Sequence, residues 1–88
     1  MMSEYVGLAL STAGHDRGRL YLVLGEDGDR LLLADGKLRK LSSPKRKNRR
    51  HVMFLPGLAE AASGKLPRPL TDAALRRFLA SARAQRAN

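Results

Sequence analysis

Short runs of hydrophobic residues, separated by turns rich in glycine and aspartate, run from residue 4 to residue 55. Runs of this length are too short for independent helices and are typical of β-strands joined by tight turns. The pattern predicts five strands, at residues 4–10, 20–24, 31–34, 37–41 and 51–55. Because edge strands expose unpaired backbone groups, five such strands are best accommodated in a curled sheet, and we expect an all-β small barrel.

Individual segments refine this expectation. Leu20–Leu24 is an unbroken apolar run, which favours a strand that is buried on both faces or that passes through the barrel. The polar Gly25–Asp29 segment predicts a hairpin turn after it. Asp35-Gly36 is a dipeptide typical of a two-residue type I′ turn, so we expect Lys37–Leu41 to follow as a strand with Leu38 pointing inward. Lys45–Arg50 is interpreted as a basic loop or extended arm.

The pattern changes after residue 55. Residues 56–70 are rich in Ala, Gly, Pro and Ser, which indicates a linker. From Thr71 to Arg86 the apolar residues recur at helical spacing, with Thr71 or Asp72 placed to cap the first turn. The apolar face would consist of Leu75, Phe78, Leu79 and Ala82. A lone helix of this length is marginal in water, so this face needs the barrel, a second copy or another protein to cover it. The expected organisation is a barrel over 1–55, a linker over 56–70 and a helix with its tail over 71–88.

The connection between the first two strands has a composition suited to phosphate. Gly14 and Gly18 bracket His, Asp and Arg residues, and glycine readily takes the positive φ of a sharp bend. We expect a bent loop that shows main-chain N–H groups to solvent, with the guanidinium groups of Arg17 and Arg19 beside them. Such donors suit phosphate oxygens. The alternative is a plain β-turn in which Asp16 bonds local amides.

This loop carries a family resemblance. Residues 14–19, Gly-His-Asp-Arg-Gly-Arg, resemble the centre of the KOW motif, a nucleic-acid-binding element of SH3-like barrels. Residues 33–41, Leu-Ala-Asp-Gly-Lys-Leu-Arg-Lys-Leu, and residues 44–48, Pro-Lys-Arg-Lys-Asn, narrow the resemblance to a small bacterial KOW-domain RNA-binding family. That family is related to the KOW-containing large-subunit ribosomal proteins of archaea and eukaryotes. Tyr21 stands where the generic motif has a further glycine, which fits the ribosomal-protein-like branch better than the transcription-elongation modules.

The resemblance covers about residues 4–54 and implies both a fold and a function. The implied fold is an SH3-like barrel of the KOW type, to which the helical pattern adds an appended C-terminal α-helix. The implied function is RNA binding, with ribosomal RNA or the ribosome as partner and a role in translation.

The charge distribution points the same way. The chain has a net charge of +9, but residues 1–35 carry −3 and residues 36–88 carry +12. Eight of the Lys and Arg residues lie between residues 37 and 50, and no acid lies between residues 36 and 59. Positive charges that are this close repel one another, so the run favours a polyanionic partner, with nucleic acid as the first candidate. The alternatives are a solvated charged face, a localisation signal and a membrane-surface patch.

The candidate site therefore combines the glycine loop, the strand after Asp35 and the basic arm. The RNA-binding candidates are Gly14, His15, Arg17, Gly18, Arg19, Lys37, Arg39, Lys40, Lys45, Arg46, Lys47, Arg49 and Arg50. Phosphate contacts would give recognition mostly of RNA shape. Tyr5 and Tyr21 are candidates for base stacking, with a place in the core as the alternative.

Other functions find little support in the sequence. There is no cysteine and only two histidines, so we expect no disulfide, no metal and no cofactor. No nucleophile, acid pair or phosphate-loop spacing indicates catalysis, and we expect no enzyme. The start resembles no signal peptide and no apolar run approaches a membrane span, so a cytoplasmic protein without membrane attachment is expected. The alternative function is an adaptor in the transcription or translation apparatus, whose barrel edge and C-terminal helix engage another protein while the basic arm gives nonspecific affinity for nucleic acid.

Overall fold

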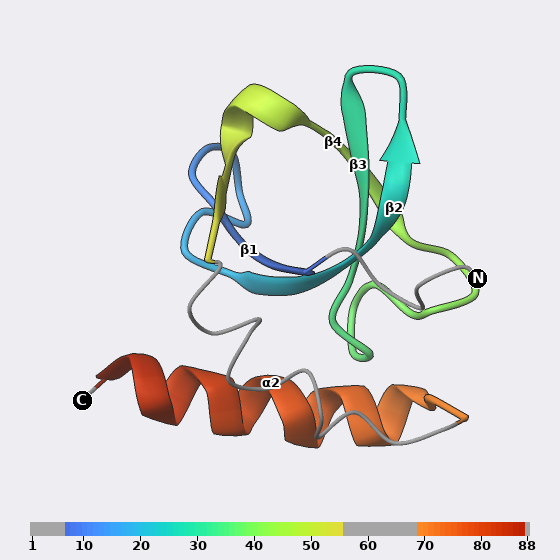
Figure 1. Ribbon diagram of the computed structural model, residues 1–88, viewed down its shortest axis with the longest axis vertical. Helices are drawn as coiled ribbons and strands as arrows, with labels where there is room; N and C mark the ends of the chain where they lie inside the picture. Colours follow the sequence, from blue (N-terminus) through green and yellow to red (C-terminus); the bar gives the residue numbers. More distant parts are fainter. Residues whose placement is uncertain (1–6, 56–68, 88) are drawn as a thin grey trace.

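The computed structural model describes residues 7–55 and 69–87, which form a curled antiparallel sheet with one helix packed against it (Figure 1). The elements are β1 (Gly7–Ser11), β2 (Leu20–Asp27), β3 (Arg30–Ala34), β4 (Lys45–Asn48), a 3-10 turn η1 (Arg49–His51), β5 (Val52–Phe54) and α2 (Asp72–Ala87). The strand order is β4-β3-β2-β1-β5, so the chain meanders through four strands and the fifth returns to pair with β1. This is a small SH3-like barrel with an appended helix, which confirms the predicted fold class.

Strand β2 supplies both hydrophobic cores of the molecule. Its side chains alternate, so Leu20 and Leu22 face outward toward α2 while Tyr21 and Val23 face the barrel interior. The interior cluster contains Ala9, Tyr21, Val23, Leu31 and Leu33, with Val52 packed against it. The prediction that this apolar run is buried on both faces is confirmed.

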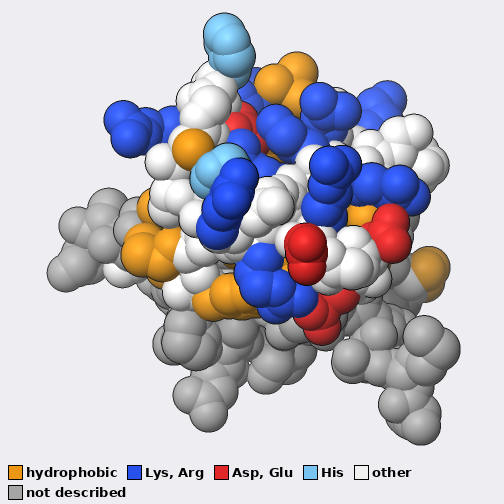
Figure 2. All heavy atoms as spheres, turned by 90° about the horizontal axis from the view of Figure 1, so that it is seen from above, with side chains coloured by type: hydrophobic (Ala, Val, Ile, Leu, Met, Phe, Trp, Pro, Cys, Tyr) orange, Lys and Arg blue, Asp and Glu red, His pale blue; other side chains and the backbone are white. Residues whose placement is uncertain are grey.

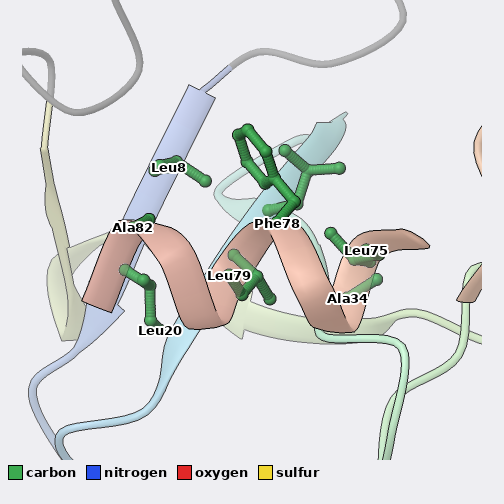
Figure 3. Packing of buried hydrophobic residues seen from close by; sticks show 8 residues of the cluster. Leu8, Leu20, Ala34, Leu75, Phe78, Leu79 and Ala82 are labelled. Carbon is green, nitrogen blue, oxygen red and sulfur yellow. The ribbon is translucent and has the colours of Figure 1, made fainter. Parts of the chain in front are cut away.

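The helix covers the outer face of the sheet. Its predicted apolar stripe, Leu75, Phe78, Leu79 and Ala82, packs against Leu8, Leu20, Leu22 and Ala34 (Figure 3). The Thr71 hydroxyl accepts a hydrogen bond from the Ala74 N–H at 3.1 Å, so Thr71 caps the helix as one of the two predicted candidates. The barrel itself, rather than a second copy or another protein, therefore covers the apolar face.

The β2–β3 hairpin has a shorter turn than the sequence predicts. A register shift between Val23 and Gly25 lets β2 continue to Asp27, which pairs with Arg30. The turn is reduced to Gly28 and Asp29, with Gly28 at φ 62°. The β-bulge beside Gly25 thus lets β2 continue past Leu24, where the sequence pattern predicts that the strand ends.

The predicted strand at Lys37–Leu41 is wrong. A type I′ turn needs positive φ at both central residues, but among the described residues only glycines have positive φ, so Asp35 cannot supply one. Its carboxylate instead accepts hydrogen bonds from the backbone N–H groups of Lys37 and Arg39, both at 2.9 Å. A side chain that bonds the following amides competes with strand pairing, and the segment between β3 and β4 remains a loop.

The interpretation of Lys45–Arg50 as a loop or arm is also wrong. Lys45–Asn48 is the edge strand β4, paired with β3 so that Lys47 lies opposite Leu31. Alternation turns the Lys45 and Lys47 side chains inward, while the Arg46 side chain stays 62% exposed. Residues 4–6 of the first predicted strand and residues 56–68 of the predicted linker lie outside the described residues.

Candidate nucleic-acid interface

The carboxylate of Asp16 in the β1–β2 loop accepts hydrogen bonds from four side chains of the barrel. Its Oδ1 accepts hydrogen bonds from the Ser11 hydroxyl at 2.9 Å and from Lys47 Nζ at 2.8 Å. Its Oδ2 accepts from the Tyr21 hydroxyl at 2.7 Å and from Lys45 Nζ at 3.1 Å. The donors come from β1, β2 and β4, and β4 is at the far end of the strand order from β1. Ionic contacts therefore link strands that share no backbone hydrogen bonds.

These contacts fix the protonation state of the cluster. Burial opposes ionisation of Asp16, but the hydrogen bonds from Lys47, Tyr21, Lys45 and Ser11 outweigh it and lower the pKa of the carboxyl far below its ordinary value. Burial, together with the adjacent Asp16 carboxylate, raises the pKa of the Tyr21 hydroxyl. Asp16 is therefore an anion and Tyr21 a neutral donor across the physiological range.

Three predicted site residues belong to this structural cluster. The Lys47 side chain is only 9% exposed and also donates to the Ala13 carbonyl at 2.8 Å, so its ammonium group is turned away from solvent. Lys45 is 25% exposed but shares the same carboxylate. Tyr21, the stacking candidate, is 1% exposed with its hydroxyl bonded inward, so it is a core residue.

Other candidate cations form more open ion pairs. Arg46 lies 3.4 Å from Asp27, and Arg49 pairs with Glu26. At the end of the barrel where η1 lies, Lys and Arg side chains cover much of the surface with Asp and Glu among them (Figure 2). Exposed pairs contribute about 0–1 kcal/mol each, so these arginines remain able to exchange partners.

The Gly14–Arg19 loop has the predicted sharp bend but fewer available amides than expected. Gly14 and Gly18 have φ values of 86° and 88°. The N–H groups of Arg17, Gly18 and Arg19 donate to carbonyl groups of the same loop and of β1. Those three amides are therefore not available to a ligand, and the loop's contribution to binding would come from its side chains.

A concave basic surface lies where this loop, the β3–β4 loop and α2 meet. We call it the basic hollow. It encloses about 490 Å³ and is lined by His15, Asp16, Arg17, Gly18, Arg19, Asp35, Lys37, Arg76 and Arg83. Arg17 and Lys37 are exposed side chains. Among the described residues neither Arg17 nor Lys37 has an ion-pair partner, and the same is true of the two helix arginines.

Sequence reasoning missed the contribution of the helix. Arg76 and Arg83 are two helical turns apart and so project from one face of α2, beside the apolar stripe. That spacing was visible in the sequence. The sequence did not show which loops these two arginines face, because that depends on how the helix packs against the sheet.

Local contacts hold the hollow in shape. Arg19 pairs with the Asp35 carboxylate at 3.2 Å, and Arg76 donates to the Gly36 carbonyl at 2.6 Å. The Leu41 N–H donates to the Asp72 carboxylate at 2.9 Å, which ties the same loop to the start of α2. Burial opposes ionisation of Asp35, but the N–H groups of Arg39 and Lys37 and the Arg19 guanidinium group lower the pKa of its carboxyl. The two acids of the hollow are thus ionised and already bonded.

The structure divides the predicted site residues into two groups. Those gathered at the basic hollow are His15, Arg17, Gly18 and Arg19 of the β1–β2 loop, together with Lys37. Gly14 of the same loop does not line the hollow and lies beside Lys47 instead. Arg39 and Lys40 are exposed on the same β3–β4 loop. Lys45, Arg46, Lys47, Arg49 and Arg50 belong instead to β4 and η1. Acids pair with four of these five cations, namely Lys45, Arg46, Lys47 and Arg49.

No family model and no curated protein matches this sequence. Within residues 7–55 and 69–87, no helix combines the length and apolar character needed to cross a membrane.

Proposed function

We propose that this protein binds RNA, and that the basic hollow is the place where it holds the phosphate backbone. One observation carries the proposal. Five cationic side chains from three separate elements converge on one concave surface whose two acids are already engaged. They are Arg17, Arg19, Lys37, Arg76 and Arg83. Arg19 pairs with Asp35, but among the described residues the other four cations have no ion-pair partner. Like charges that converge in this way repel one another, and a phosphate backbone relieves that repulsion.

The geometry suits phosphate in particular. Guanidinium groups bind phosphate oxygens in a bidentate fork, and four of the five cations are arginines. The hollow is open to solvent rather than enclosed, which suits an extended chain better than a small anion held on all sides. Contacts of this kind position the backbone without reading base sequence.

The choice of RNA over other polyanions comes from the loop sequence. Charge alone fits DNA, RNA or an acidic protein. The resemblance of residues 14–19 to the KOW centre and of residues 33–48 to a ribosomal-protein-like family favours RNA, with ribosomal RNA or the ribosome in the cytoplasm as the partner. The adaptor alternative has lost one of its two surfaces, because the apolar face of α2 is buried against its own sheet.

The first experiment compares two variants of the full chain that lose equal charge. One carries Arg17→Gln, Lys37→Gln and Arg83→Gln, all at the basic hollow. The matched control carries Arg46→Gln, Arg49→Gln and Arg77→Gln, which lie outside it. The probe is a fluorescein-labelled fragment of ribosomal RNA, titrated by fluorescence anisotropy at several salt concentrations.

The hollow variant is expected to bind more weakly and to lose about 2 units of the log–log salt slope, since each lost phosphate contact to unpaired RNA removes about 0.7. The control should lose much less. Equal losses in both variants would mean that only net charge matters and would reject the basic hollow. Sedimentation with ribosomal particles at low and high salt tests the ribosomal partner separately.

A further inference from the structure

A second hollow adjoins the basic hollow and has different chemistry. It encloses about 350 Å³ and shares His15, Asp16 and Arg19 with its neighbour. Beyond these it is lined by Leu38, Arg39, Tyr21 and Lys45. We call it the adjoining hollow. Because the two share a wall, one ligand of moderate size can reach both.

The distinctive residue of the adjoining hollow is Leu38. Its side chain is 66% exposed, although the sequence pattern placed it inward. It sits between two cations of one loop, and these neighbours divide the two hollows: Lys37 lines the basic hollow and Arg39 the adjoining one. Three successive residues thus present an ammonium group, an apolar surface and a guanidinium plane in turn.

This order matches the chemistry of a nucleotide. A phosphate needs cations, whereas a base offers a flat face that packs on apolar side chains or on an arginine plane. We infer that the two hollows together hold one unpaired RNA nucleotide, its phosphate in the basic hollow and its base in the adjoining hollow against Leu38 and Arg39. This inference rests on the proposed function and specifies the form of RNA that is bound.

Base pairing would prevent this arrangement. In an A-form duplex the bases are stacked inside the helix, so a duplex offers phosphates, 2′-hydroxyl groups and base edges but no free base face for Leu38 and Arg39. The inference therefore differs from recognition of RNA shape alone, which the sequence suggested. It predicts a preference for unpaired RNA.

The test uses the full chain and two labelled probes, a ten-nucleotide single-stranded RNA and the same strand annealed to its complement. Wild-type protein should bind the single strand more tightly than the duplex at equal salt. Leu38→Ala should weaken binding of the single strand about fivefold, because the base loses apolar surface on which to pack, and leave duplex binding unchanged. Met53→Ala removes another exposed apolar side chain, 44% exposed on β5 and outside both hollows, and should change neither.

The outcomes separate this inference from the proposed function. Tighter binding of the duplex, or single-strand affinity that is equal in Leu38→Ala and wild type, would overturn the nucleotide pocket and leave RNA binding in place. Failure of both probes to bind even in dilute buffer would overturn both. Circular dichroism of each variant checks that the fold is intact.

Discussion

Lys37 and Lys47 belong to the same basic run of the sequence, yet the fold gives them opposite surroundings. Lys47 is buried on β4, where Asp16 and a backbone carbonyl accept its hydrogen bonds. Lys37 is exposed at the basic hollow, with no ion-pair partner among the described residues. Residue type and position in a basic run do not decide what a cation does. What decides it is whether an acid from a distant part of the sequence, such as Asp16, lies beside the cation in the fold.

The two environments also differ in energy. Removing one partner of a buried ion pair leaves an unpaired charge in a poorly solvated place and costs about 3–5 kcal/mol. Removing an exposed cation leaves water in its place and changes the free energy of unfolding by less than about 0.5 kcal/mol. The lysines of β4 are therefore expected to act on stability, and Lys37 at the basic hollow on binding.

The largest effect tests this division directly. Lys47→Met should lower the free energy of unfolding by about 3 kcal/mol, because Asp16 loses the more buried of its two cationic partners while Lys45 remains. Lys37→Met should leave unfolding unchanged and weaken RNA binding. Urea denaturation measures the first effect and anisotropy the second. If both variants lost the same stability, the contrast between the two lysines would be false.

A smaller loss is expected at the junction between the hollow and the helix. Gly36 has φ 78°, and a Cβ there would overlap the Asp72 backbone oxygen and press on the Arg76 side chain. Gly36→Ala should cost about 2 kcal/mol, from backbone strain of about 1 kcal/mol and the overlap. Gly28→Ala is the matched control, because Gly28 also has positive φ but its Cβ would meet nothing within 4 Å.

Gly28→Ala should therefore cost only the backbone strain, about 1 kcal/mol. Thermal or urea unfolding of the two alanine variants measures the difference. Equal losses would show that the contact between the β3–β4 loop and α2 does not constrain the hollow.

The smallest effect appears in acid. The folded-state pKa of Asp16 is lowered from an ordinary value of 3.8, so its contribution to stability is complete above that value and is lost as pH falls through the lower, folded value. Each pH unit below 3.8 should remove about 1.4 kcal/mol, so about 1 kcal/mol is lost by pH 3. Asp35 contributes in the same direction.

Urea unfolding between pH 7 and pH 3 measures this slope. Asp16→Asn should flatten it, whereas Asp29→Asn, an exposed acid in the β2–β3 turn, should not. A stability that is independent of pH in the wild type would contradict the ionised cluster.

The parts of the fold that rest on local chemistry follow from the sequence. The spacing of Leu75, Phe78, Leu79 and Ala82 identifies the buried helix face, and Leu20–Leu24 identifies the central strand. β4 could not be found in this way, because its inward residues are lysines rather than hydrophobic residues. They are buried only because Asp16, remote in sequence, lies beside them.

The candidate site shows the same limit. The glycine loop was identified from residues 14–19, and its sharp bend is confirmed. Three of its amides are bonded to carbonyl groups of the loop and of β1, because the bend turns them toward neighbouring backbone. The helix arginines could not be anticipated, because their place depends on how distant segments pack together. Local patterns locate the elements, but they do not show which charges meet.

The packing of α2 on the outer face of the sheet has a consequence for biosynthesis. The five strands end at Phe54 and the helix begins at Asp72, so the strands leave the ribosome before the segment that covers them. Until that segment emerges, Leu8, Leu20 and Leu22 present an apolar face to solvent, a surface prone to aggregation. A nascent chain stalled after β5 should bind chaperones, and one that includes α2 should not.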